Sequence, residues 1–208
     1  MRQDLTLHHA EAEVRKAFAQ ADARIAILKA RQQTASNETT ISGLIADIAD
    51  HISDDAAEVV GAIEADLNQA IKSADRTLDA VSNRSAQIRQ AVAFLKGDPS
   101  AITMVRDADL RNFALSAKSS LDAGAIDGRA EIQSIEHALS QIAMRETDLR
   151  SKFLPAAKSS AKIVRNKAVA VAFDKTNPET AATFQKLADR QALRHRKAFG
   201  VQEGRKNV

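Results

Sequence analysis

Lysine and arginine recur near the C-terminus of the chain at the spacing of an α-helix. One row has steps of four, four and three residues from Lys186 to Lys197, so its members share one side of a helix. A shorter row begins upstream at Lys158. Rows of cations can bind the phosphates of a nucleic acid or of an anionic lipid surface. The candidate patch for an anionic partner comprises Lys158, Lys162, Arg165, Lys186, Arg190, Arg194, Arg196 and Lys197.

The acidic part of the chain supplies an alternative partner for these cations. Residues 38–79 hold ten acidic and two basic residues, whereas residues 145–208 hold fifteen basic and six acidic ones. Opposite charges attract, so the basic rows can pair with the acidic segment of the same chain or of another copy. Cations near a helix C-terminus are also favoured by the helix dipole alone. No aromatic platform or helix-turn-helix pattern accompanies the basic rows, and both interpretations stay open.

One group of histidine and carboxylate side chains has the spacing of a metal site. Asp47, His51 and Asp55 are four residues apart and so lie on one helix face, where they could ligate a divalent cation. That face is the polar side of the surrounding apolar pattern, and the chain contains no H-E-x-x-H or E-x-x-H pair. We therefore interpret the group as solvated charge and expect neither a metal nor a cofactor.

Nucleophilic catalysis finds little support in the residue types. The chain has no cysteine, and no serine stands in a G-x-S-x-G elbow or in an S-x-x-K motif of strand-turn-helix context. The carboxylates follow the surface spacing of helices, with no cleft to shift their pKa values toward catalytic use. We expect no catalytic residues, no small-molecule substrate and no enzymatic activity.

The elements that carry these residues are expected to be long helices. Apolar residues recur every three or four positions, and the longest stripe runs from Ile41 to Leu95. The turn Gly97, Asp98, Pro99 should then reverse the chain, so that a second stripe ending near Phe153 lies antiparallel to the first. The predicted helices are 5–35, 37–96 with Asn37 as its N-cap, 100–153, 156–173 after a kink or a restart at Pro155, and 178–199; residues 201–208 are predicted to be a disordered tail.

Two glycines interrupt the second stripe and allow two interpretations. Gly124 and Gly128 are four residues apart, so as small residues on one helix face they could permit close packing against a neighbouring helix. Alternatively they mark a bend at 124–128, where Gly124 ends one helix and Asp127 caps the next.

Composition favours an all-α fold with a thin core. Hydrophobic residues make up 44% of the 208 residues, but many are alanine, and only 3% are aromatic. This composition suits a long antiparallel, coiled-coil-like helical hairpin with shorter flanking helices, forming one elongated domain over 1–200. The first residues are not a secretory signal, and the longest apolar run, 168–173, is shorter than the ~20 residues that span a bilayer, so we expect a cytoplasmic location.

The function expected from these features is that of a non-enzymatic scaffold or protein–protein interaction protein. A thin apolar stripe on a long helix is hard to bury within one hairpin, so the chain should associate with itself as a homo-oligomer or with another helical protein. One alternative is a peripheral binder of nucleic acid or anionic membrane that acts through the basic C-terminal helices. Another is a cytoplasmic signalling or regulatory hairpin.

Overall fold

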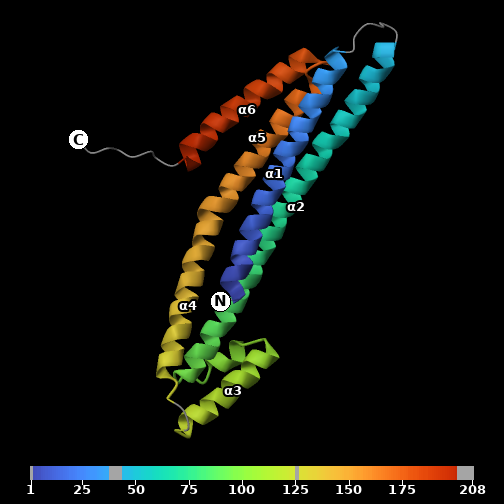
Figure 1. The fold of residues 1–208 in the computed structure, drawn as a ribbon. Helices are drawn as coiled ribbons and strands as arrows, with labels where there is room; N and C mark the ends of the chain where they lie inside the picture. Colours follow the sequence, from blue (N-terminus) through green and yellow to red (C-terminus); the bar gives the residue numbers. More distant parts are fainter. Residues whose placement is uncertain (1, 38–43, 125–126, 201–208) are drawn as a thin grey trace, which may run out of the picture. The chain divides into compact units, whose positions relative to one another are not determined.

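The computed structural model describes the backbone of residues 2–37, 44–124 and 127–200, and the side chains of residues 5–31, 55–124 and 127–200. Helices make up the described chain almost entirely, and it contains no strand, so the predicted all-α fold is confirmed (Figure 1). The elements are α1 (Arg2–Asn37), α2 (Leu44–Leu95), the 3₁₀ turn η1 (Ala101–Met104), α3 (Ala108–Asp122), α4 (Arg129–Asp148), the π-helical turn η2 (Leu149–Phe153), α5 (Leu154–Phe173) and α6 (Pro178–Phe199). The predicted tail, 201–208, lies outside the described residues.

Two predictions about helix boundaries are wrong. Asn37 is the last residue of α1 and does not cap the next helix, and the helix predicted over 100–153, with a bend at 124–128 as its alternative, is also divided between η1 and α3. The division has a local cause, because Val105 is extended (φ −78°, ψ 106°) and Asp107 caps α3 by accepting a hydrogen bond from the Leu110 amide at 2.8 Å. At Pro155 the α-helix restarts, which was one of the two outcomes predicted there: α5 begins at Leu154, and Pro155 lies in its first turn, where the missing N–H costs least.

The chain divides into two compact units, and α1 and α2 contribute to both. The first unit comprises Met1–Ala10 and Asp75–Arg150, and the second comprises Glu11–Ala74 and Ser151–Val208. The expected single domain over 1–200 stays a prediction.

The core of the second unit lies between α1, α2 and α5. Ile63 and Leu67 of α2 are buried among Ala17 and Ala21 of α1 and Ala168 of α5. A second layer of the same three helices joins Leu28, Ala56 and Ala172. From the first layer to the second, residue numbers rise along α1 and α5 and fall along α2, so α2 runs antiparallel to both. The apolar stripe of this part of α2 therefore packs on α1 and α5, not on the segment that follows Gly97.

The first unit contains the predicted fold-back, but α4 makes it. Lys96, directly after α2, pairs with Glu136 of α4 at 2.8 Å, and Asp79 of α2 pairs at 2.7 Å with Arg150 of η2, directly after α4, so α2 and α4 are antiparallel. In the sequence, η1 and α3 come between α2 and α4. They fold across the end of α2 (Figure 1), where Ala91, Val105 and Ala114 form a small core. The chain thus turns twice, once after α2 and once after α3.

Candidate functional site

Helix α6 carries most of the predicted cationic patch, and its start is well defined. The Asn177 side chain accepts a hydrogen bond from the Thr180 amide at 3.1 Å. Pro178 and Glu179 lie in the first turn, where proline is well tolerated and a negative charge interacts favourably with the positive end of the helix dipole. The helix continues to Phe199, the range expected from the sequence.

One side of α6 packs on α5 in the second unit (Figure 1). Ala181 and Ala188 are buried there. Polar contacts accompany them: Asn166 of α5 donates to the Gln191 side chain at 3.0 Å, and the Ser160 hydroxyl lies 3.5 Å from Nε2 of His195. Asn166 is itself only 5% exposed, so its bond satisfies a buried amide as well as setting how the two helices align.

The opposite side of α6 faces solvent and holds the cations. At 100° per residue, Lys186, Arg190 and Lys197 lie within about 20° of the direction opposite Ala188, and Arg194 lies about 60° from it. All four side chains are exposed, as is that of Arg196, which lies on a different side of the helix. Within the described part of the chain, no hydrogen bond or ion pair engages these four cations. We call Lys186, Arg190, Arg194 and Lys197 the cationic face.

The acidic residues of α6 do not neutralise this face. Asp189 accepts a hydrogen bond from the Gln185 side chain at 3.0 Å, on a flank of the helix. Glu179 lies seven residues before Lys186, about 10 Å along the helix axis. The cationic face therefore keeps a net positive charge.

The upstream basic row behaves differently. Arg165 of α5 donates from Nε to Oε2 of Glu64 in α2 at 2.9 Å, and so pairs with the acidic segment of its own chain. Lys158 and Lys162 are exposed on the same helix. The two rows predicted as one patch are thus distinct in their partners, since an intramolecular ion pair already engages Arg165.

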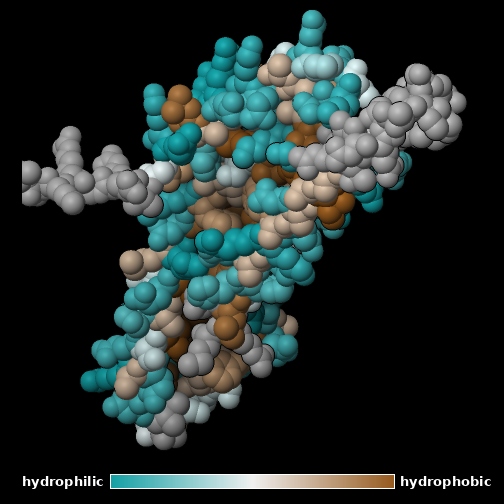
Figure 2. Space-filling view, turned by 45° about the horizontal axis from the view of Figure 1, so that its top comes forward, coloured by the Kyte–Doolittle hydropathy of each residue, from teal (hydrophilic) through white to brown (hydrophobic). Residues whose placement is uncertain are grey.

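Apolar side chains stand among the cations, a feature that the sequence interpretation missed. Leu193 is 51% exposed and Leu187 is 37% exposed. Leu193 lies three residues after Arg190 and four before Lys197, so it adjoins both on the helix surface. The signal was present in the sequence as leucines outside the Ala181 to Ala188 stripe, but charge spacing alone does not reveal it. Brown hydrophobic residues are visible among teal hydrophilic ones on the face shown in Figure 2.

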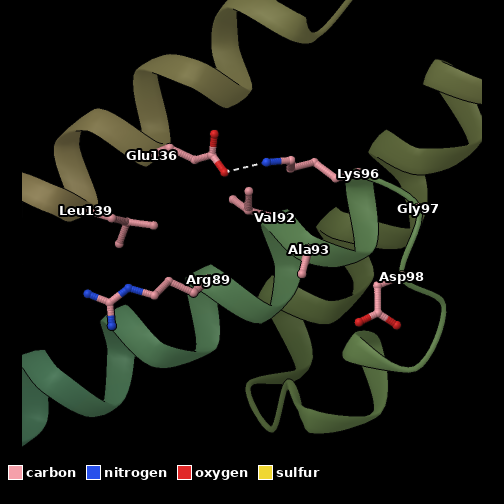
Figure 3. A pocket seen from close by; sticks show the side chains of 8 residues that line it. All are labelled: Arg89, Val92, Ala93, Lys96, Gly97, Asp98, Glu136 and Leu139. Atoms are coloured by element: carbon pink, nitrogen blue, oxygen red, sulfur yellow. Dashed lines mark hydrogen bonds and ion pairs between the residues drawn. The ribbon is translucent and has the colours of Figure 1, made fainter.

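The predicted turn borders a cavity in the first unit. Gly97 has φ +111°, and Asp98 accepts hydrogen bonds from the Ser100 hydroxyl at 2.6 Å and the Ser100 amide at 3.0 Å, which lower the pKa of its carboxyl. Pro99 is exposed in the same turn. A cavity of about 480 Å³ lies between the end of α2 and α4; Figure 3 shows the Lys96 and Glu136 ion pair among its lining side chains. The lining is a mixture of exposed charges and a few apolar side chains.

Gly124 and Gly128 mark a bend between α3 and α4. Gly124 has φ +67°, and a Cβ added there would meet nothing within 4 Å, so this glycine serves the backbone and not close packing. Gly128 precedes α4, and a Cβ there would meet Leu121 of α3 at 2.8 Å. The tight contact is thus between the ends of α3 and α4 and not between long helices.

Two further predictions concern metal and membrane. The side chains of Asp47 and His51 lie outside the described residues, and within the described ones no group of three or more histidine, cysteine or carboxylate residues could hold a metal ion. No helix in the described chain combines the length and apolar character needed to cross a membrane.

Comparison with known proteins adds no relative. No family model, curated protein or solved structure matches this chain.

Proposed function

We propose that this chain is a non-enzymatic helical scaffold that binds further copies of itself, in the cytoplasm. The observation that carries the proposal is the exposure of Phe113 on α3, where 69% of the residue is accessible to solvent. It is one of only seven aromatic residues, all of them phenylalanine.

The packing of α3 supports a role for its outer surface. Its only fully buried side chain among the described residues is the small Ala114, with Leu110 partly buried beside it. Larger apolar groups point elsewhere: Phe113 and Leu115 flank Ala114, and Leu115 is 46% exposed. Burying a phenylalanine side chain stabilises an association by about 1.5–3 kcal/mol, so a second copy that covers Phe113 would gain appreciably.

The shifted pKa values support a non-enzymatic role. The pKa of Asp98 is lowered because its carboxyl accepts hydrogen bonds from Ser100, and that of Asp107 because it accepts a hydrogen bond from the Leu110 amide and lies beside the Arg84 guanidinium. Arg150 has a raised pKa because it donates to Asp79 and Glu146. Each shift has a cause in helix ends and ion pairs, which are structural arrangements.

The test is the molar mass in solution. Size exclusion with light scattering over a range of concentrations should give a mass above the 22.4 kDa of one chain, and Phe113→Ser should lower it. Ile27→Ser, at a residue 53% exposed on α1, is the matched control and should leave the mass unchanged. A monomer at every concentration would refute self-association, and equal effects of both variants would remove α3 from the interface.

A further inference from the structure

We infer that the cationic face of α6 binds the surface of an anionic lipid bilayer. This inference is independent of self-association, because it concerns a different unit and different residues. It rests on three observations: the arrangement of the cations, the lack of an ion pair to any of them among the described residues, and the leucines beside them.

The cations form a line that a flat charged surface can contact at once. Lys186 and Lys197 are eleven residues apart, which is about 17 Å along the axis, with Arg190 between them on the same side. Because α6 is held by Asn177 at its start and by the bond between Asn166 and Gln191 further along, the line is presented by an ordered helix. Binding therefore does not have to order a loop first.

Within the part of the chain that the structure describes, no acidic side chain pairs with these cations, so they are available to an external anion. Arg165 shows the contrasting case, since it would have to give up Glu64 to bind an external anion. The side chains of the cationic face have no such partner within the described residues. Their long aliphatic stems also let the charges reach outward while the backbone remains packed on α5.

The leucines decide between a lipid surface and a nucleic acid. Half-exposed Leu193 lies beside Arg190 and Lys197, and Leu187 lies on the other edge of the face. A phosphate backbone offers such side chains no apolar contact, whereas the boundary between headgroups and acyl chains accepts both leucine and cation. A mixture of cations and leucines on one outward face therefore fits an anionic bilayer better than a nucleic acid.

The test is co-sedimentation of the full-length chain with vesicles. Binding is expected to phosphatidylcholine vesicles that contain phosphatidylserine, to be lost with phosphatidylcholine alone, and to weaken with salt. Removing one cation should weaken binding about fivefold, so Arg190→Gln with Arg194→Gln should weaken it about 30-fold and the double glutamate variant more.

Two controls distinguish loss of the cationic face from a change in net charge and from unfolding of α6. Lys72→Glu with Arg76→Glu reverses two cations at the same four-residue spacing on α2, and should weaken binding much less than Arg190→Glu with Arg194→Glu. Circular dichroism should show the same helicity for all variants, and Arg190→Gln with Arg194→Gln gives a second reading if the glutamates unfold α6.

Leu193→Ser, which leaves the charge unchanged, tests the lipid assignment. It should weaken vesicle binding several-fold without changing the salt dependence. The inference is overturned by no binding to anionic vesicles, by equal loss in the α2 control, by unchanged binding of Leu193→Ser, or by tighter binding to duplex DNA than to vesicles at the same salt.

Discussion

Arg165 of α5 and Glu64 of α2 are joined by an ion pair, with 2.9 Å between Nε and Oε2. These residues are 101 positions apart in the chain, and one belongs to the basic C-terminal segment while the other belongs to the acidic segment. The pair shows that part of the charge asymmetry of the sequence is satisfied within the molecule. It also separates Arg165 from the cationic face of α6.

This pair should contribute little to stability. Both side chains are 45% exposed, and exposed ion pairs contribute about 0.2–1 kcal/mol to the free energy of unfolding. We expect Arg165→Ala and Glu64→Ala, compared with the double variant in urea unfolding, to give a coupling energy in that range that falls with salt. A coupling energy several times larger would mean that the pair is better shielded from solvent than its exposure indicates.

Replacing Ile63 by alanine should be costly. Ile63 is fully buried where α1, α2 and α5 meet, and truncation of a buried isoleucine costs about 2–5 kcal/mol through lost apolar contact and a residual cavity. Ile27→Ala, at an exposed residue of α1, should change the free energy of unfolding by no more than about 0.5 kcal/mol. Urea unfolding of both variants measures the difference, and similar values for the two would contradict the position of the core.

Two glycines should respond to alanine with opposite signs. Gly61 is a helical residue of α2 with nothing within 4 Å of an added Cβ, so Gly61→Ala should raise the free energy of unfolding by about 0.5–1 kcal/mol. Gly97 has φ +111°, which alanine adopts only with strain, so Gly97→Ala should lower it by more than about 1 kcal/mol. Thermal unfolding checks both, and a stabilising Gly97→Ala would contradict the turn geometry.

Asp107 should make the first unit sensitive to acid. The Leu110 amide and then the Arg84 guanidinium lower the pKa of Asp107 from its usual 3.8, because both favour the charged carboxylate. A lowered pKa in the folded state means that its stabilising contribution is complete above pH 3.8 and is lost as the pH falls through the folded pKa.

Two variants isolate this contribution. Asparagine keeps the N-cap but not the charge, so at neutral pH the Tm should fall from wild type to Asp107→Asn and further to Asp107→Ala. The difference in Tm between wild type and Asp107→Asn should shrink as the pH is lowered below 3.8. A difference that is constant with pH would mean that the charge of Asp107 has no role.

Asn166→Ala should loosen α6 without unfolding the molecule. The variant removes the donor of the 3.0 Å bond to Gln191 and leaves space in a buried position of α5. A lost buried hydrogen bond of this kind costs about 1–3 kcal/mol. Hydrogen exchange should accelerate in α6 and remain unchanged around Ile63, and faster exchange throughout would show that α6 is not a separable element.

Local patterns in the sequence were enough to establish that the chain is helical and where most of its helices run. Helix periodicity is local, so the stripe that includes Ile63 and Leu67 could be identified without knowing what it contacts. The start of α6 could also be predicted, because Asn177 and Pro178 favour a helix start through local contacts in the first turn. The turn at Gly97 could be predicted for the same reason.

Which stripes meet and which charges remain free depends on how the helices are arranged in space. A stripe rich in alanine and isoleucine fits several partners, so nothing local in α2 distinguishes α1 and α5 from the segment after Gly97. Asp107, which caps α3 through a local contact, also pairs with Arg84, 23 positions away in the chain, and nothing in the local sequence predicts that contact. In the same way Arg165 and Arg190 look alike in the sequence, and the difference between them arises because Glu64 lies within reach of one, while no described acidic group engages the other.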